Sequence, residues 1–502
     1  MPAHAVMPTG WSSPLGRLLS RTGLGVLSCF IPPSLVDEAL AVAGRDEQRF
    51  RALPSRLGVC LVLALCLLRA QSAAAVTQAM IPPGMVRRLA GLGWALPTST
   101  ALTKLRDRLG VVPFQLLFTA MTRPVPTLVR PWSHAFGLQV CAWDGTEITV
   151  DDTPANREHF RRHRGGNGPV GTPKARVLVL LACGTRQLLG AVTGGLGQGE
   201  VTLARRLVTF LRPGMLLLAD RNFLGYPLWS AARARGTHLL WRAKLDKPLL
   251  SPQHLLPDGS WLAILHDPAD ARAWRNNVRR NRKRGHRPPK PRPIQGITVR
   301  VIEAWITVTV DGVPRTQKYR LVTSLLDTDS APADQLVALY ARRWVAETGI
   351  RELKTVLLQG QQLRGRTPIR AQQELWAALT TYQTIRLLIT HAANTGTLDP
   401  SRISFTAARD TATAAITITP GQAREHLEHT CQHLHRQLIT RHTHHRIFPR
   451  ALKNTLHRYP HNGKTRQLTC TTASYRINTA TPTTGQDTAN PTHPRASLSS
   501  WH

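Results

Sequence analysis

Residues 214–223 read GMLLLADRNF, in which five apolar residues run directly into Asp220. A short apolar run bounded by turn residues is typical of a β-strand buried on both faces. A carboxylate at the end of such a strand costs free energy unless it is paired or bound to a metal, and strand ends are where α/β sheets place their sites. Asp220 is therefore a candidate site residue, although a single aspartate in this position is more often a turn or helix-cap residue.

The neighbouring sequence predicts the rest of a sheet. An apolar run at 138–143 ends at Asp144, within the block WDGT, and two further strands are predicted at 176–182 and 187–192, joined by a hairpin turn. Helical spacing follows at 200–211 and 226–234, with a strand at 238–242. Strands followed by alternating helices and strands favour a mixed α/β sheet. Two strand-end aspartates in one chain indicate a site more strongly than either alone.

A long amphipathic helix predicted at 333–359 carries the third acidic residue. Tyr340, Arg343, Glu347 and Lys354 follow the spacing Y-(2)-R-(3)-E-(6)-K, and steps of three, four and seven place them on one helix face. Such a face suits a phosphodiester held by a metal ion: the carboxylate would bind the cation, and Arg343 and Lys354 would bind phosphates. The alternative is an ordinary salt-bridged surface, because the helix is charged on its other faces too.

These three blocks together resemble the DDE transposases of the insertion-sequence-4 family. The helix fills all four positions of the family's Y-(2)-R-(3)-E-(6)-K signature, residues 143–146 with 152–156 resemble its first aspartate region, and residues 218–223 resemble its second. The resemblance runs from about residue 20 to about residue 475. It implies an α/β fold with a ribonuclease H-like core, a mixed sheet flanked by helices, plus a β-rich insertion and a helical N-terminal domain.

The resemblance also implies an activity and roles for individual residues. The implied function is a DNA transposase that cuts DNA at element ends and transfers the strands to target DNA. Its catalytic and metal-binding residues would be Asp144, Asp220 and Glu347, holding two Mg²⁺ or Mn²⁺ ions, which prefer oxygen ligands. The residues that would contact DNA are Tyr340, Arg343, Lys354, Arg221 and Asn222.

The predicted domain organisation follows the same comparison. Five regions are expected: residues 1–130, a helical N-terminal domain that could bind DNA ends; 131–245, the first part of the ribonuclease H-like core; 246–324, the β-rich insertion with a basic loop; 325–395, the second part of the core with the Glu347 helix; and 396–502, a basic C-terminal region with a disordered tail. The basic loop is expected at 272–292, where ten Lys or Arg residues and several prolines occur without a carboxylate. It could be simply disordered or contact a DNA backbone.

The charge balance indicates the partner. The 502 residues include 65 Lys and Arg against 29 Asp and Glu, a net charge of +36. An excess of this size is an electrostatic footprint for nucleic acid; a ribosomal-type basic protein or membrane binding are weaker readings. The expected partner is DNA, both element ends and target, bound by a homodimer as the resemblance implies.

The cysteine pattern and hydropathy indicate the compartment. Seven scattered cysteines form no C-x-x-C pair, which argues against zinc ribbons and disulfide frameworks. No signal-peptide layout is expected at the N-terminus, and the most apolar run, residues 57–68, is too short to cross a bilayer. A cytoplasmic, nucleoid-associated bacterial protein with no membrane contact is expected.

Several other residues and segments are alternative candidates for a functional role. Asp151 and Asp152 rival Asp144, although Asp152 reads as a turn residue. Glu200 opens a helix, where its charge suits the helix dipole. A histidine-rich face at 426–433 is read as a solvated basic surface rather than a zinc site, and the glycines at 194–199 as a loop rather than a nucleotide-binding turn. The alternative functions are a transposase-derived DNA-binding protein without strand-transfer activity and a nuclease that does not join DNA.

Overall fold

The structure, a computed structural model, describes residues 13–47, 53–122, 130, 132–166, 168–245, 250–287, 289–290, 292–310, 313–439 and 474–479. Most of the predicted C-terminal tail therefore lies outside the described residues. Among the described helices, none is both long and apolar enough to cross a bilayer.

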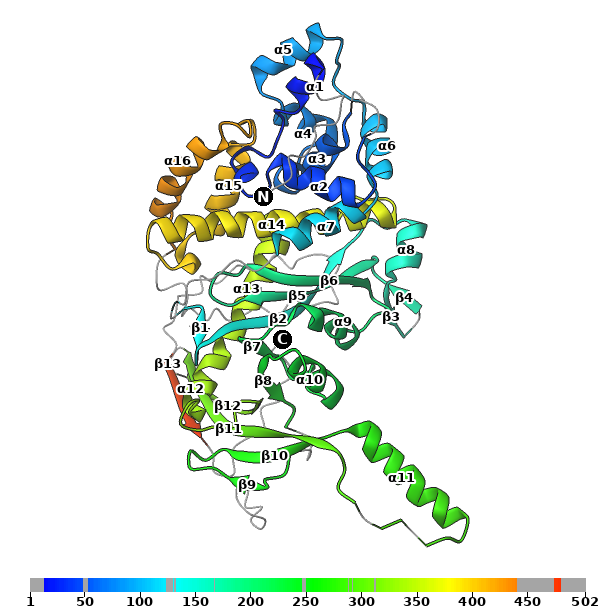
Figure 1. The fold of residues 1–502 in the computed structure, drawn as a ribbon, viewed down its shortest axis with the longest axis vertical. Helices are drawn as coiled ribbons and strands as arrows, with labels where there is room; N and C mark the ends of the chain where they lie inside the picture. Colours follow the sequence, from blue (N-terminus) through cyan, green and yellow to red (C-terminus); the bar gives the residue numbers. More distant parts are fainter. Residues whose placement is uncertain are drawn as a thin grey trace.

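One mixed sheet of 11 strands organises the molecule (Figure 1). Its strands are β1 (His134–Ala135), β2 (Leu138–Thr149), β5 (Lys174–Ala182), β6 (Leu188–Gly195), β7 (Met215–Ala219), β8 (His238–Ala243), β9 (His254–Leu255), β10 (Trp261–His266), β11 (Gly296–Val310), β12 (Val313–Thr323) and β13 (Ser474–Thr479). Two short strands, β3 (His163–Gly165) and β4 (Gly168–Val170), form a separate hairpin.

The strand order shows which known architecture the core has. Along the sheet the order is β6-β5-β2-β7-β8, in which β2, β7 and β8 are parallel and β5 and β6 are antiparallel to their neighbours. Counted as the first five long strands of the chain, this is the order third, second, first, fourth, fifth. It confirms the expected ribonuclease H-like core, with its sheet flanked by helices.

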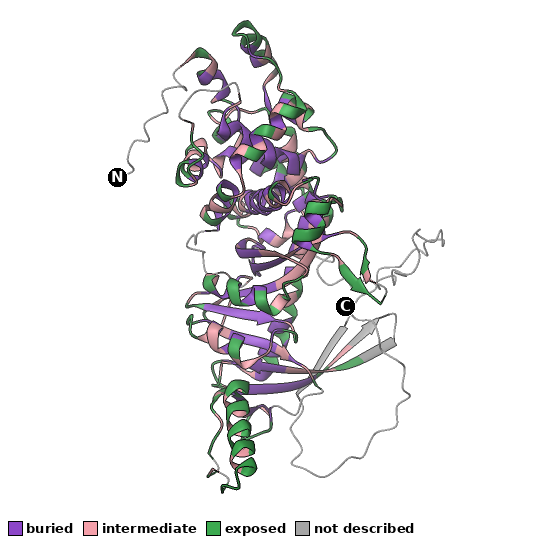
Figure 2. Cartoon of the chain, turned by 90° about the vertical axis from the view of Figure 1, so that its right-hand side faces the viewer, coloured by how far each residue is buried: buried purple, intermediate pink, exposed green. Residues whose placement is uncertain are grey.

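The two faces of this core bury different side chains, because successive residues of a strand point to opposite faces. Residues 216 and 218 of β7 join one large hydrophobic cluster, and residues 217 and 219 join a second one. The first cluster also contains α12 and α13 side chains, whereas the second contains Trp143, Trp229 and Trp241. Figure 2 shows the strands between them as buried.

Helices cover both faces of the sheet. On the side of the three tryptophans lie α9 (Glu200–Leu207), extended by the 3-10 turn η3 (Val208–Phe210), and α10 (Tyr226–Arg233); α8 (Pro154–Phe160) lies near the β3–β4 hairpin (Figure 1). The opposite face carries one helical run with three changes of geometry: α12 (Ala333–Tyr340), the 3-10 turn η4 (Ala341–Arg343), α13 (Trp344–Arg351) and the π-helical turn η5 (Glu352–Leu357).

A helical lobe at one end of the sheet combines N-terminal helices with helices that follow the Glu347 helical run. Its N-terminal elements are α1 (Pro14–Leu19), η2 (Gly25–Cys29), α2 (Pro33–Val42), α3 (Ser55–Leu67), α4 (Ala73–Met80), α5 (Pro83–Gly91), α6 (Ser99–Leu109) and α7 (Val112–Met121). Its later elements are α14 (Pro368–Thr395), η6 (Pro400–Arg402), α15 (Phe405–Ala414) and α16 (Ala423–Arg436). The long helix α14 packs against α3, α7 and α16, so the lobe and the sheet share one hydrophobic cluster.

A buried ion-pair network joins the Glu347 helical run to this lobe. Glu352 lies in the π-helical turn and accepts hydrogen bonds from Arg186, at 2.7 Å, and from Arg386 of α14. The Tyr382 hydroxyl lies 3.3 Å from the same carboxylate. Glu352 is 4% exposed and Arg386 is completely buried, so this network ties α14 to the end of the helix that carries Glu347.

The segment between β8 and α12 continues the sheet. β12 pairs antiparallel with β8, and β11, β10 and β9 follow in order. The predicted β character of 297–310 and 318–324 is confirmed. The sheet therefore runs without interruption from the core strands into the insertion.

The prediction of a basic loop at 272–292 was wrong for its first half. Residues Pro268–Lys283 form α11, which projects from the sheet and buries none of its residues (Figures 1 and 2). The Asp267 side chain caps the helix by accepting from the Ala269 amide, and Pro268 occupies the first turn. The prolines that suggested a loop all follow the helix, at 288–293.

The predicted end of the strand at Asp144 was also wrong. β2 continues to Thr149 because β5 pairs with it antiparallel from Cys141 to Thr149, beyond the point where β7 ends. Asp144 is therefore in the middle of a strand, but at the end of the parallel part of the sheet.

Candidate active site

Asp144 and Asp220 are neighbours on adjacent parallel strands. The β2–β7 ladder pairs Gln139 with Met215 and Ala142 with Leu218, and the same offset sets Asp144 beside Asp220 where β7 ends. Neighbouring strands lie about 4.8 Å apart. Both aspartates also continue the alternation that points residues 140, 142, 216 and 218 toward the cluster containing α12 and α13. The two carboxylates thus face the helix that carries Glu347.

Glu347 is connected to the site by a hydrogen bond with Arg343. The Arg343 guanidinium donates a hydrogen bond of 3.0 Å to the Glu347 carboxylate, one helical turn away. The pKa of Arg343 is raised: burial would lower it, but Tyr340, Glu347, Asp144 and Asp220 together outweigh that effect. All three acids therefore lie close enough to the Arg343 guanidinium to favour its charged form.

The surroundings of Asp144 disfavour the charged form of its carboxyl group. Burial raises the pKa of Asp144 to about 6, against the opposing effects of Arg343 and of the Gly145 amide; Glu347 and Glu200 raise it further. The Gly145 N–H donates to the Asp144 carboxylate at 2.8 Å. An ionised carboxylate in this place gains free energy from any additional positive charge.

Two close contacts hold the helix across the strand ends. The Tyr340 hydroxyl donates to the Ala219 carbonyl at 3.1 Å, directly before Asp220. Gly349 allows α13 to approach the sheet, because a Cβ there would lie 2.6 Å from Leu181 Cδ2 and 3.0 Å from the Tyr382 hydroxyl. Tyr340 is 6% exposed, so its hydroxyl is used by the protein in this state, and its contact with DNA stays a prediction.

Two known protein families match this chain. Residues 21–119 match the family described as insertion element 4 transposase N-terminal, and residues 135–383 match the transposase DDE domain. The chain is a member of the insertion-sequence-4 family of DDE transposases. The second match contains both aspartates and the whole Glu347 helical run.

Two curated proteins and one solved structure are similar to this chain. The chain is 26% identical over 390 residues to the transposase InsG of insertion sequence element IS4 from Escherichia coli, covering 77% of this chain and 81% of that one. It is 29% identical over 157 residues to the Escherichia coli protein InsZ, covering 30% of this chain and 50% of that one. Among solved structures, the piggyBac transposase synaptic complex with hairpin DNA overlaps 84% of this chain and 87% of its own, with 11% identity and a TM-score of 0.42.

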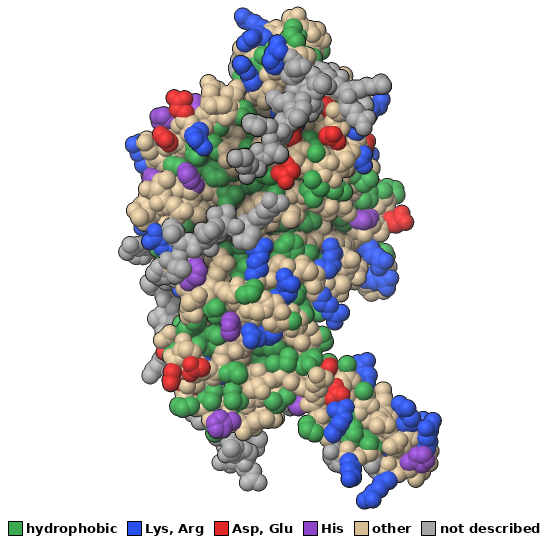
Figure 3. Space-filling model, in the orientation of Figure 1, with side chains coloured by type: hydrophobic (Ala, Val, Ile, Leu, Met, Phe, Trp, Pro, Cys, Tyr) green, Lys and Arg blue, Asp and Glu red, His purple; other side chains and the backbone are tan. Residues whose placement is uncertain are grey.

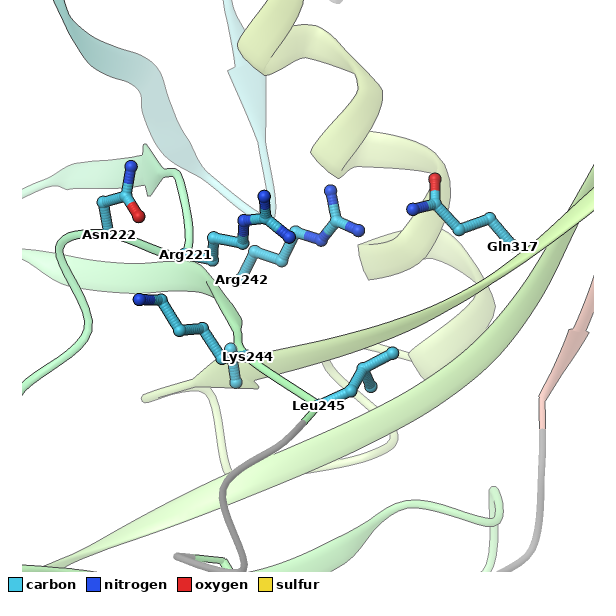
Figure 4. A pocket seen from close by; sticks show the side chains of 7 residues that line it. Arg221, Asn222, Arg242, Lys244, Leu245 and Gln317 are labelled. Atoms are coloured by element: carbon cyan, nitrogen blue, oxygen red, sulfur yellow. The ribbon is translucent and has the colours of Figure 1, made fainter. Parts of the chain in front are cut away.

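The transposase places its remaining predicted DNA-contacting residues in two positions. Arg221 and Asn222 follow β7 directly and line a pocket beside Asp220 (Figure 4). Lys354 lies in the π-helical turn, half-buried, beyond the point where regular α-helical spacing applies. Arg343 ends the 3-10 turn η4 and still shares a helix face with Glu347, as their hydrogen bond shows. The α-helical spacing that placed Lys354 on the same face does not apply in the π-helical turn.

The two rival aspartates have other partners in the transposase. Asp152 is held by Arg157, at 2.8 Å, and by Arg162, and hydrogen bonds from these two arginines keep its pKa well below the usual range. The Asp151 carbonyl accepts from Asn156, and its amide donates to the Leu363 carbonyl. Both residues shape the turn that leads into α8.

Glu200 lies closer to the site than its sequence suggested. It opens α9, and its carboxylate lies so close to Gly145 that a Cβ there would be 2.9 Å from Glu200 Oε1. It is among the charges that raise the pKa of Asp144. The signal in the sequence was a glutamate at a helix start after a glycine-rich loop, which by itself indicates only a favourable helix-dipole interaction.

The site has donors of the kind that a hard divalent cation prefers. Its three acids offer carboxylate oxygens, the preferred ligands of Mg²⁺ and Mn²⁺, and burial is the main cause of the raised pKa of Asp144. Across the described part of the chain, no three His, Cys, Asp or Glu side chains are arranged as a complete metal site. The chemistry of the donors fits, with Glu347 bonded to Arg343 in this state.

Proposed function

We propose that this transposase cuts DNA at the ends of an element and joins the freed 3′-hydroxyl groups to target DNA, using Asp144, Asp220 and Glu347. The observation that supports this most is the register that sets the two aspartates side by side, facing the Arg343–Glu347 pair. Such a cluster of acids in a strongly basic protein suits the cleavage of a phosphodiester.

The residues of the site would have separate roles in this reaction. Asp144, Asp220 and Glu347 would hold two Mg²⁺ or Mn²⁺ ions, which when bound activate the attacking oxygen and stabilise the leaving one. Arg343 neutralises charge among the acids and, with Lys354, would bind phosphate oxygens. The Tyr340 hydroxyl keeps the helix against the end of β7, which fixes Glu347 relative to Asp220.

We also propose an oligomeric state on DNA and a division of the chain into regions. A homodimer on paired DNA ends, acting in the bacterial cytoplasm on nucleoid DNA, is the expected assembly. The five regions predicted from the sequence are retained as a proposal, with the insertion at 246–324 built on the same sheet as the core.

A cleavage and joining assay tests this function. The DNA is a duplex carrying the terminal repeat that flanks the coding sequence, together with a supercoiled target plasmid. Cleavage that requires Mg²⁺ or Mn²⁺, followed by covalently joined products, is expected. Cutting without joining would indicate a nuclease, and binding without any metal-dependent cutting would indicate a DNA-binding protein derived from a transposase.

The arm formed by α11 gives a separate prediction about salt dependence. Arg272, Arg275, Arg279 and Arg282 are exposed and follow steps of three and four, so they form one basic stripe along the helix. Figure 3 shows Lys and Arg side chains gathered on this projecting arm. Asp270 of its first turn pairs with Arg292 of the returning chain, at 2.9 Å, which leaves the stripe for an external anion.

Changing these four arginines to glutamine is expected to weaken DNA binding for every sequence tested. Each lost phosphate contact should reduce the slope of log affinity against log salt by about 0.9. The change is measured by fluorescence anisotropy between low and moderate salt. Asn276→Ala with Asn277→Ala is the matched control on the same helix, and an unchanged slope in the four-arginine variant would contradict the assignment of the arm.

A further inference from the structure

A basic pocket adjoins the end of β7. It has a volume of about 400 Å³ and is lined by Arg221, Asn222, Arg242, Ala243, Lys244, Leu245 and Gln317 (Figure 4). Its lining contains three cations and no acid. Of the ion pairs between described residues, none involves Arg221, Arg242 or Lys244, although many other arginines of this chain are paired.

The register of the parallel strands places Arg242 in one row with the catalytic aspartates. β7 pairs Ala219 with Trp241 of β8, so the next step along both strands sets Asp220 beside Arg242. The β2–β7 ladder likewise sets Asp144 beside Asp220. Leu240 belongs to the same cluster as Leu218, so Arg242 points to the same face as the two aspartates.

Aromatic contacts fix the Arg242 guanidinium. Its Cζ lies 3.9 Å from the centre of the Tyr319 ring, on β12. The Tyr319 ring packs edge-on against Tyr340 at 6.4 Å, and the Tyr340 hydroxyl is bonded to the Ala219 carbonyl. A stacked guanidinium keeps the N–H donors at its edge available for an anion. Arg242 is thus held in place relative to Asp220 by a residue of the insertion.

We propose that Arg242, Arg221 and Lys244 form a binding site for a DNA phosphodiester next to the scissile one, with Tyr319 as the positioning residue for Arg242. The site rests on the proposed function, because its ligand is the strand that Asp144 and Asp220 act upon. A guanidinium edge matches the two oxygens of a phosphodiester. An unpaired base is a poorer occupant, because Arg242 already covers the face of the Tyr319 ring.

Binding to backbone-modified DNA tests the site. The probe is the terminal-repeat duplex with single neutral methylphosphonate linkages, moved one position at a time through the cleavage region, and binding is measured in EDTA. The wild-type protein is expected to lose roughly tenfold to a hundredfold in affinity at one or two positions beside the scissile phosphate, as a charge-assisted hydrogen bond is lost.

Substitutions in the pocket test whether this loss of DNA affinity arises there. Arg242→Gln should bind natural DNA about as weakly as wild type binds the modified DNA, and should show no further loss at those positions. Tyr319→Leu should give part of this loss and Tyr319→Phe none. Arg436→Gln, the same substitution on the exposed surface of α16, should behave as wild type at every position.

Two results would overturn the site. The first is that Arg242→Gln retains the full methylphosphonate effect at every position. The second is that Arg242→Gln responds to removal of one base and not to any change of the backbone, which would make the occupant a base. Because binding is read without metal, absence of metal-dependent cleavage by the wild type would count against the proposed function alone.

Discussion

Glu347→Gln is expected to lower the rate of DNA cleavage by about three orders of magnitude or more while DNA affinity changes only a few-fold. A ligand carboxylate supplies several kcal/mol of transition-state stabilisation through its metal, and each 1.36 kcal/mol corresponds to a factor of ten in rate. Glutamine has the same shape and can still accept the hydrogen bond from Arg343, so the helix should stay in place.

The same loss is expected for Asp144→Asn and Asp220→Asn, measured as single-turnover cleavage of the terminal-repeat duplex in Mg²⁺ and in Mn²⁺. Asp151→Asn is the matched control, because Asp151 is close in sequence and its carboxylate faces Arg366 rather than the acids. If Glu347→Gln cut DNA at the wild-type rate, the assignment of the third acid would fail. If Asp151→Asn lost cleavage as severely as Asp144→Asn, the choice of the first aspartate would need revision.

Glu352→Ala is expected to lower the free energy of unfolding by about 3–5 kcal/mol. Glu352 is 4% exposed, and it is bonded to two buried arginines, Arg186 and Arg386. Its removal leaves two guanidinium charges without a carboxylate in the apolar region between the core and α14. Urea unfolding followed by tryptophan fluorescence measures the loss.

An exposed ion pair provides the control for this experiment. Arg370 pairs with Asp107 at 2.7 Å, but the Asp107 side chain is 49% exposed. Arg370→Gln is expected to cost less than about 1 kcal/mol, as exposed pairs usually do. Equal losses in the two variants would show that the buried network contributes no more than a surface pair.

Acid unfolding gives a second readout of the same network. Burial alone would raise the pKa of Glu352, but Arg386 and Arg186 outweigh burial and hold it below its usual value. The stability from this carboxylate is therefore present above the unfolded pKa of about 4.3 and is lost as pH falls through the lower folded pKa. Glu352→Gln should remove this part of the acid transition, and an unchanged acid limb would contradict the assignment.

The sequence predicted the parts of the fold in which local pattern and tertiary environment agree. β7 and β8 are apolar runs buried on both faces, and α10 has clear helical spacing, so their positions were predicted closely. The end of β2 was not, because its continuation past Asp144 depends on β5, which pairs with it from the far side. Pairing of this kind is not visible in the sequence of a single strand.

In the candidate site, the sequence likewise predicted the residues that belong to local patterns and missed those whose position depends on packing. Asp220 and Glu347 belong to local patterns, whereas Glu200 approaches Gly145 only through the packing of α9 on the sheet. The place of Arg242 in the row of aspartates depends on the register between β7 and β8. The π-helical turn at Glu352 arises where the helix meets two buried arginines, and regular helical spacing cannot anticipate it.

The two ends of the projecting arm lie side by side where β10 ends and β11 begins. Its two limbs begin at His266 and Gly296, which are cross-strand partners, and the Asp267 amide donates to the Gln295 carbonyl at 2.7 Å. Because the helix between them buries nothing, its length and charge can vary without a change in the catalytic sheet. The arm is therefore a structurally separate unit, so a change in its sequence is expected to alter the proposed contact with DNA and to leave the proposed active site unaltered.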